Sequence, residues 1–335
     1  MSEIVTYWQA LNRALDEAMA ADESVFVLGE DVGLYGGSYR VTEGLYARYG
    51  EERVRDTPIS EGSFAGLGVG AALAGMRPVV EIMTVNFALL ALDAIVNMAA
   101  KVPFMSGGQF PMGVTFRMPG GVAHQLAAQH SQRLEQMFMN VPGLRIMIPA
   151  TPQDAYWQLG QAIRSDEPVV FLEHELLYFE KGELDTGIEP PPAHRAAIRT
   201  AGRDVTIVAY SRMAELARTA AEGPLATSGV SAEVIDLRSL GPVDWETCVG
   251  SADRTGRVLI VEEDSRFAGA GAELAAGITD RCFDSLDRPP LRLGALDLPT
   301  PFNGALERAT IPTVDDIVAA ALQLSPTHRS TGGAR

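Results

Sequence analysis

Short apolar runs alternate along this chain with longer stretches in which apolar residues recur at helical spacing. Continuous runs of this kind are typical of strands buried on both faces, and the 3.6-residue repeat is typical of helices that cover a sheet. Strands are predicted at residues 24–31, 77–83, 113–117, 144–148 and 168–172. Helices are predicted at residues 61–75, 87–98, 134–139 and 151–164. Strands that alternate with helices in this way indicate βαβ units and a mainly parallel sheet, so the fold class is α/β.

The same pattern divides the chain into two domains. Residues 1–22 carry apolar positions at helical spacing and predict a first amphipathic helix. Between residues 178 and 203 the periodicity fades and glycine and proline accumulate, which is typical of a linker. A second set of strands follows, and a last helix is expected at 314–324. We therefore predict a first domain at 1–180, a linker at 181–203, a second domain at 204–325 and a flexible tail at 326–335.

The predicted helix at 61–75 is unusual because a carboxylate opens a run that has no other charge until Arg77. Gly62, Gly66 and Gly70 recur at every fourth position and form a nearly bare stripe, although a glycine inside a helix costs about 1 kcal/mol relative to alanine. We expect another segment to approach this stripe closely, and Ser60 to cap the helix. Two interpretations of Glu61 remain open: a capping acid before a tightly packed helix, or a protonatable carboxylate held in a dry pocket.

Composition narrows the possible partners. The 335 residues carry a formal net charge of −16, which disfavours non-specific binding to nucleic acid or to an anionic membrane. Only two cysteines occur and they form no CxxC pair, which argues against a disulfide framework or a structural zinc site. The start lacks the features of a signal peptide, and no apolar run is long enough to span a bilayer. We expect a cytoplasmic protein.

Several residues are candidates for chemistry. Met83 and Phe87 flank a strand-to-helix turn, where open α/β sheets bind ligands, but ordinary core packing explains them equally well. His130 lies in a polar loop and is either a structural hydrogen-bonding residue or a proton donor and acceptor. The glycines at 66–70 and 269–271 do not form a dinucleotide-binding fingerprint, because the first group follows a helix-entry acid instead of a strand and the second lacks the third glycine of GxGxxG.

Six ordered blocks give the chain a specific resemblance, which covers about residues 3–325. These blocks are 29–33 (GEDVG), 56–61 (DTPISE), 77–87 (RPVVEIMTVNF), 105–111 (MSGGQFP), 128–132 (AQHSQ) and 141–144 (VPGL). Together they resemble the beta subunit of the thiamine-diphosphate-dependent first component of 2-oxo acid dehydrogenase complexes, in its pyruvate-type branch. The resemblance implies a thiamine-diphosphate pyrimidine-binding fold followed by a transketolase C-terminal-like domain.

The resemblance also implies roles for individual residues. Glu61 is expected to bind the aminopyrimidine of thiamine diphosphate and to act in catalysis, with Ile59, Met83 and Phe87 lining the same pocket. His130 is expected to assist proton transfer while the acyl group passes to lipoamide.

The family shares its cofactor between two subunits. The alpha subunit is expected to hold magnesium and the diphosphate, and this chain lacks the usual Gly-Asp-Gly signature for that task. The implied assembly is a heterotetramer of two alpha and two beta chains, which binds a lipoyl acyltransferase core through the second domain, with Asp287 as one contact. Relatives often hold potassium near residues 162–164. Here Ser165 and Glu167 occupy the polar positions, which leaves potassium open.

Other functions remain as alternatives. Acetoin dehydrogenase and branched-chain 2-oxo acid dehydrogenase beta subunits share this fold and differ in substrate. A non-catalytic interaction subunit would retain the fold without the chemistry, and a free-standing NAD oxidoreductase would need a nucleotide site that the glycine pattern does not provide.

Overall fold

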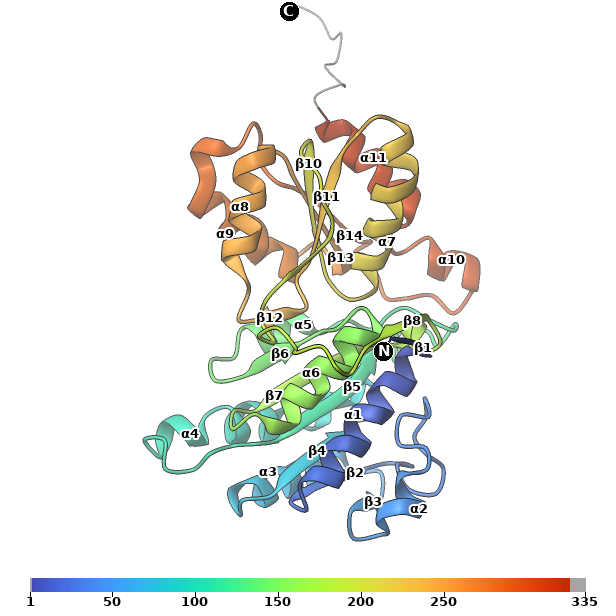
Figure 1. The fold of residues 1–335 in the computed structure, drawn as a ribbon, viewed down its shortest axis with the longest axis vertical. Coiled ribbons are helices and arrows are strands. Elements are labelled where there is room, and N and C mark those ends of the chain that lie inside the picture. The colour runs from blue at the N-terminus through green and yellow to red at the C-terminus, as the bar shows by residue number, and fades with distance from the viewer. Residues whose placement is uncertain (1, 326–335) are drawn as a thin grey trace, which may run out of the picture.

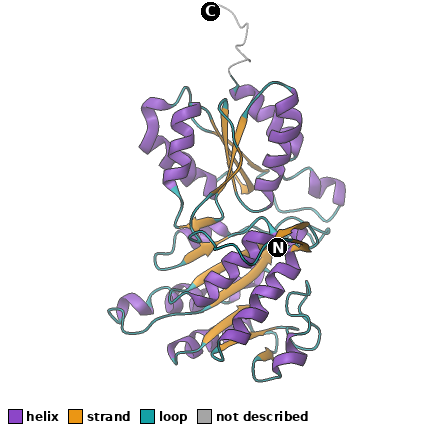
Figure 2. Ribbon diagram, in the orientation of Figure 1, coloured by secondary structure: helices purple, strands orange, loops and turns teal. Residues whose placement is uncertain are grey.

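The computed structural model describes residues 2–325, which form two large sheets with helices on both faces of each, and a small two-stranded sheet (Figure 1). Six strands from residues 25–174 and one from residues 239–241 form a seven-stranded sheet, and residues 197–295 supply a five-stranded sheet. Figure 2 shows one large sheet above the other, with helices flanking each. The predicted two-domain α/β architecture is confirmed. The tail predicted at 326–335 lies outside the described residues.

The first sheet is almost entirely parallel. Its strand order is β12-β6-β7-β5-β4-β2-β3, and only β12 runs antiparallel to its neighbour. All five residues of β2 are buried, as expected for a strand covered on both faces. The strands are β2 (Val25–Gly29), β3 (Val54–Asp56), β4 (Arg77–Glu81), β5 (Thr115–Gly120), β6 (Arg145–Met147), β7 (Val169–His174) and β12 (Ser239–Gly241).

Helices cover both faces of this sheet and separate two apolar clusters. α1 and α6 pack together over one face, where Leu11, Leu15 and Leu159 are fully buried. The opposite face is covered by α3, η1 and η2, whose Phe64, Ala88 and Ile95 join the larger cluster. The segments are α1 (Tyr7–Ala21), α2 (Leu45–Tyr49), α3 (Glu61–Leu73), η1 (Val85–Leu90), η2 (Asp93–Ala99), α4 (Val102–Met105), α5 (Glu135–Met139), α6 (Pro152–Arg164) and η3 (Glu175–Leu177).

Two expectations for this half need correction. The first helix begins at Tyr7, because the residues before it form a strand, β1 (Glu3–Thr6), that pairs antiparallel with β8 (Lys181–Leu184). Thr6 then caps α1 by accepting a hydrogen bond from the Gln9 amide. The single helix expected at 87–98 is instead a 3₁₀-helix, η1, followed by a π-helix, η2.

The second sheet repeats the parallel design with five strands. Its order is β14-β13-β10-β11-β9, and β9 alone is antiparallel to its neighbour. Its strands are β9 (Ala197–Thr200), β10 (Val205–Ala209), β11 (Ala232–Asp236), β13 (Val258–Ser265) and β14 (Leu291–Ala295). In Figure 1 the helices α8 and α9 lie on one side of this sheet, and α7 and α11 lie on the other. The helical segments are α7 (Arg212–Ala220), η4 (Ala221–Leu225), α8 (Trp245–Thr255), α9 (Ala270–Cys282), η5 (Phe283–Ser285), α10 (Gly304–Arg308) and α11 (Val314–Leu324).

The segment expected to be a linker, residues 181–203, contains two strands. β8 pairs with β1 at the start of the chain, and β9 forms one edge of the second sheet. In addition, β12 comes from the second half of the chain and completes the edge of the first sheet. These crossed pairings tie the two halves together, and the boundaries at 180 and 204 stay a prediction.

Candidate functional site

The carboxyl ends of three neighbouring parallel strands bring the candidate residues together. Gly29, the last residue of β2, is in register with Asp56 of β3 and with Glu81 of β4. The chain therefore leaves all three strands at one edge of the sheet, with Glu30 directly after β2 and Met83 two residues after β4. Ligands bind at this edge in open α/β sheets, so the sheet itself positions a site here.

Glu61 opens α3 at this edge and is 4% exposed. The predicted cap is wrong in one detail: Ser60 stands at the N-cap position, but its hydroxyl donates to the Pro58 carbonyl at 3.1 Å and caps no amide. Glu61 is the acidic residue in the first helical turn, where the helix dipole favours a negative charge. The carboxylate is thus buried at a helix N-terminus, as both interpretations of the sequence require.

The glycine stripe of α3 is approached at one end only. A Cβ on Gly62 would lie 3.0 Å from the Leu90 carbonyl, so η1 packs against the first turn. Gly66 and Gly70 are exposed, and beyond their chain neighbours and the backbone of α3 itself no described atom lies within 4 Å of a Cβ built on either. The close approach expected along the whole stripe is therefore made within this chain only at Gly62. The rest of the stripe is open to solvent.

A second acid, Glu30, belongs to the site although sequence reasoning did not select it. Glu30 is 6% exposed, and its Oε1 is buried without a hydrogen-bond partner. Burial first, and then the charges of Glu61, Asp31 and Glu81, raise the pKa of Glu30 to about 7. Within residues 2–325, no lysine, arginine or histidine forms an ion pair with Glu30 or Glu61. The only sequence signal was a pair of acids directly after a buried strand.

Glu81 lies beside these acids but is neutralised. Arg117 of β5 is 1% exposed and forms an ion pair with Glu81, and its Nη2 donates to Glu173 Oε2 at 2.9 Å. The Tyr178 hydroxyl also donates to Glu173. This buried network fixes the strand ends, because each charge in it is paired and hydrogen-bonded.

The structure brings Phe87 and His130 together from distant parts of the sequence. Their ring centroids lie 5.3 Å apart at an interplanar angle of 81°, an edge-to-face arrangement. Phe87 lies in η1 and is half-buried, whereas His130 lies in a loop and is exposed. Of the other two candidates, Met83 is half-buried after β4, and Ile59 is 85% exposed in the loop before α3.

The loop that carries His130 is held by the second domain. The Val122 amide donates to Glu263 Oε1 at 2.6 Å, and the Gln125 amide donates to Glu307 Oε1 at 2.8 Å. Gln125 and its neighbour His124 both have positive φ, a backbone conformation that costs energy for residues other than glycine. The strained loop therefore depends on contacts from both domains for its shape.

These residues fit one end of a flat nitrogen heterocycle. Glu30 and Glu61 offer carboxylates without cationic partners, which can accept hydrogen bonds from ring nitrogen or amino groups. Met83 and Phe87 offer apolar contact beside them, and the exposed Ile59 offers more. The arrangement suits the aminopyrimidine that the resemblance implies.

The described residues also bear on metal binding. Within residues 2–325, no group of three or more histidine, cysteine, aspartate or glutamate side chains could hold a metal ion. At the place where the resemblance leaves potassium open, Arg77 Nη1 donates to the carbonyls of Ser165 at 2.9 Å and Ile163 at 3.3 Å. Its Nη2 donates to Asp166 Oδ1 at 2.6 Å. A guanidinium already supplies the positive charge, so these residues do not fit a potassium ion at this place.

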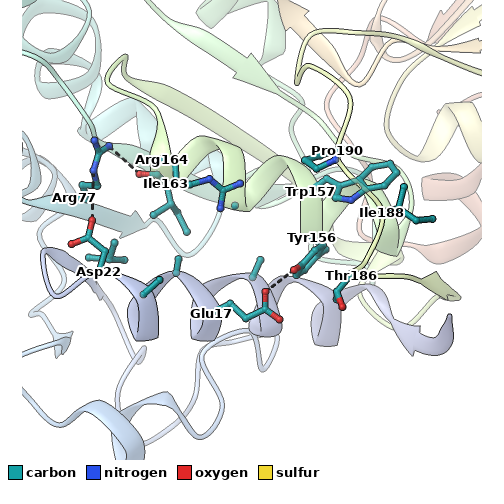
Figure 3. A pocket seen from close by; sticks show the side chains of 15 residues that line it. Glu17, Asp22, Arg77, Tyr156, Trp157, Ile163, Arg164, Thr186, Ile188 and Pro190 are labelled. Carbon is teal, nitrogen blue, oxygen red and sulfur yellow. Dashed lines mark hydrogen bonds and ion pairs between the residues drawn. The ribbon is translucent and has the colours of Figure 1, made fainter. Parts of the chain in front are cut away.

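Arg77 lines a cavity that is separate from the strand-end site. The cavity has a volume of about 420 Å³ and lies between α1 and α6, where Figure 3 shows Arg77 directed at the Ile163 carbonyl. Arg77 Nε also lies 3.8 Å from Asp22 Oδ2, which makes an ion pair. The Tyr156 hydroxyl donates to Glu17 across the cavity. Its charged groups are thus largely paired with one another.

In residues 2–325 no helix combines the length and the apolar character needed to cross a bilayer.

Comparisons with known proteins agree with this geometry. A family model described as "Transketolase, pyrimidine binding domain" matches residues 3–181, and one described as "Transketolase, C-terminal domain" matches residues 194–317. A solved structure named "Split gene transketolase, inactive beta4 tetramer" superposes with a TM-score of 0.77 and 24% identity, and the match covers 96% of this chain and 98% of that one. At that identity the likeness shows the fold alone.

Curated relatives are more similar in sequence. The chain is 46% identical to "Pyruvate dehydrogenase E1 component subunit beta-2, mitochondrial" of Oryza sativa subsp. japonica, over 95% of this chain and 85% of that protein. It is 47% identical to "Pyruvate dehydrogenase E1 component subunit beta" of Gracilaria tenuistipitata var. liui, over 96% and 98% of the two chains. It is 45% identical to the protein of the same name in Rickettsia felis, over 94% and 97%.

Proposed function

This chain belongs to the family of beta subunits of the pyruvate dehydrogenase E1 component, and on that premise we propose that its strand-end site is the aminopyrimidine half of a thiamine diphosphate site shared with an alpha subunit. The activity is that of a pyruvate-type 2-oxo acid dehydrogenase, which decarboxylates the 2-oxo acid and acylates the lipoyl group of an acyltransferase. The observation that carries the proposal is the pair of buried carboxylates, Glu30 and Glu61, at this edge without a cationic partner.

Glu61 is the proposed catalytic acid–base residue of this chain. Its burial at the start of α3 excludes water and leaves its oxygens free to hold a proton against a ring nitrogen. Glu30 supports it, because a neighbouring acid with a pKa of about 7 carries a proton for part of the time at neutral pH. Thiamine diphosphate, when bound, supplies the electron sink that lets carbon dioxide leave.

Ile59, Met83 and Phe87 are proposed to contact the aminopyrimidine. Phe87 and Met83 are half-buried and already ordered by the turn after β4, so they offer a preformed apolar surface. Ile59 is exposed to 85% in this chain, and a large apolar side chain in that position is expected to become buried when cofactor and alpha subunit are present.

His130 is the second proposed catalytic residue. It is exposed at the open side of the site, and its ring meets the edge or face of Phe87. Histidine can donate and accept protons near neutral pH, which suits a group that assists transfer of the acyl group to an incoming lipoyl thiol.

The proposed assembly is a heterotetramer of two alpha and two beta chains, with the alpha chain holding magnesium and the diphosphate. The open stripe of α3 supports it, together with exposed apolar side chains on the neighbouring segments, such as Leu90 and Phe104. Potassium is not part of the proposal, because the Arg77 guanidinium already donates to the Ile163 and Ser165 carbonyls.

The second domain is proposed to bind the lipoyl acyltransferase core. Asp287 forms an ion pair with Arg257 and remains 52% exposed, so it can still face a basic partner surface. We propose a cytoplasmic location on the sequence pattern alone.

The test is a substrate comparison with the chain copurified with a candidate alpha subunit. Rates of lipoyl acylation are measured with pyruvate, with branched-chain 2-oxo acids and with acetoin. Preference for pyruvate supports the proposal. Preference for acetoin or for a branched substrate would keep the site and replace the substrate, and absence of thiamine-diphosphate-dependent turnover with all three would overturn it.

A further inference from the structure

Asn86 and Gln132 form a direct side-chain contact across 46 positions of sequence. Asn86 Nδ2 donates to Gln132 Oε1 at 2.7 Å, and the Gln132 backbone amide donates to Asn86 Oδ1 at 3.4 Å. Asn86 Oδ1 also accepts a hydrogen bond from the Thr84 hydroxyl at 3.3 Å. Asn86 is 6% exposed, so the contact has a buried end at Asn86 and an exposed end at Gln132. We call this pair of residues the amide clamp.

The amide clamp joins the two segments that carry Phe87 and His130. Asn86 directly precedes Phe87, and Gln132 follows His130 by two positions. The backbone is tied at the same place, because the Gly121 amide donates to the Gln132 carbonyl at 3.2 Å. A Cβ on Gly120 would lie 2.7 Å from Val85 Cγ1, so the two segments approach as closely as glycine allows.

The loop between these anchors has little order of its own. Residues 121–134 contain no helix or strand, and His124, Gln125 and Ala127 have positive φ. The exposed His130 therefore depends for its position on the contacts that the loop makes with the second domain and on the amide clamp, which lies two residues after His130.

We propose that Asn86 and Gln132 are positioning residues whose contact holds the His130 ring against Phe87 in the geometry that acyl transfer requires. The inference rests on the proposed function of His130 and Phe87. The clamp acts through orientation, because small displacements of a reacting group cause large losses of rate.

Isosteric variants separate this role from a merely structural one. An amide can rotate, so Asn86→Asp and Gln132→Glu each leave one donor and one acceptor in contact. The double variant places two carboxylates face to face and breaks the contact without changing its shape. We expect each single variant to keep lipoyl-acylation kcat within about threefold, and the double variant to lose at least about tenfold, with KM for the 2-oxo acid nearly unchanged.

The matched control is Asn140→Asp combined with Gln323→Glu, which adds the same charge at two exposed positions away from the clamp. This control should behave like the unaltered protein. All variants are measured as the copurified enzyme, and its tetrameric assembly is verified first.

A second readout does not depend on activity. In the full chain with ¹³C-labelled histidine, the His130 resonance should be shifted by the Phe87 ring, and Phe87→Leu gives the unshifted reference. We expect the shift in both single variants and its loss in the double variant. A double variant that keeps both the shifted resonance and full kcat would overturn the clamp. If the unaltered enzyme accepts no 2-oxo acid, the proposed function fails, while the NMR comparison still decides the clamp.

Discussion

Acidic side chains stand near the carboxyl ends of parallel strands in both sheets, but the two sheets treat them differently. In the second sheet, Asp236 of β11 accepts from Arg199 at 2.7 Å and Glu262 of β13 accepts from Arg292 at 2.8 Å. In the first sheet, Glu30 and Glu61 are also buried, at 6% and 4% exposed, and within the described residues no cation pairs with either.

The difference teaches how to separate structural from functional acids on one fold. A buried carboxylate is costly unless it is paired and hydrogen-bonded. Asp236 and Glu262 of the second sheet are stabilised by arginines, and the Gly271 amide also donates to Glu262 at 2.7 Å. In the first sheet, the neighbouring acids Glu30 and Glu61 are buried without such partners, which is the expected state of a site that binds a ligand.

The strongest test of this contrast is Glu61→Gln in the assembled enzyme. Loss of the proton-holding carboxylate should lower decarboxylation by about 10³-fold, equivalent to about 4 kcal/mol, while assembly and stability are retained. Steady-state kinetics and analytical ultracentrifugation measure the two effects. Glu52→Gln, at an exposed position of the same domain, is the control and should be fully active. Near-normal activity of Glu61→Gln would remove it from the mechanism.

Glu262→Ala tests the other side of the comparison. It leaves Arg292 and the Gly271 amide without their buried partner, so the free energy of unfolding should fall by about 3 kcal/mol. Urea unfolding of the chain measures this loss, and the exposed Glu273→Ala is the control. Decarboxylation per assembled enzyme should change less than about threefold. A large loss of activity at full stability would mean that paired acids also carry chemistry.

The pH dependence of stability sharpens the comparison at Glu30. Because the folded-state pKa of Glu30 is about 7 and its ordinary value is 4.5, the folded chain binds the proton more tightly than the unfolded chain. The resulting stability is fully present below about pH 4.5 and is lost as the pH rises through 7.

Glu30→Gln should therefore match the unaltered chain at about pH 4 and exceed its stability by about 1 kcal/mol at pH 8. Thermal unfolding at the two pH values measures this difference. Equal effects of the substitution at both pH values would show that the pKa of Glu30 is not raised.

The smallest expected effect concerns potassium. Arg77 already donates to the Ile163 and Ser165 carbonyls, so exchange of potassium for sodium should leave the melting temperature of the chain unchanged. Arg77→Met should create a difference between the two salts, because it frees those carbonyls for a cation. A marked dependence on potassium in the unaltered chain would show that an ion binds beside the guanidinium.

Much of the fold could be predicted because the apolar pattern is local. The helix expected at 314–324 matches α11 (Val314–Leu324), and α3 begins at Glu61 as expected. The misses involve partners far away in sequence. β1 pairs with β8, and the paired residues, such as Glu3 and Leu184, lie so far apart in sequence that no local pattern predicts the pairing. The division of residues 85–99 into η1 and η2 also has no local signal, because no proline or glycine interrupts that stretch.

The site was predictable to the extent that residue type and motif order reveal it. Glu61 and Phe87 were selected from the sequence, and the structure places both at the strand-end edge. Glu30 was not selected, because its burial beside Glu61 depends on the register of β2 with its neighbours. The contact between Asn86 and Gln132 could not be found, since it depends on how a loop of 14 residues returns to the sheet.

The central claim is that the unpaired acids of the first sheet form half of a shared cofactor site. Calorimetric titration with thiamine diphosphate and magnesium tests it on the chain alone, on the chain copurified with an alpha subunit, and on that complex with Glu61→Gln. The account predicts binding only in the complex, weakened by the substitution. Tight binding to the chain alone, or equal binding by the Glu61→Gln complex, would contradict it.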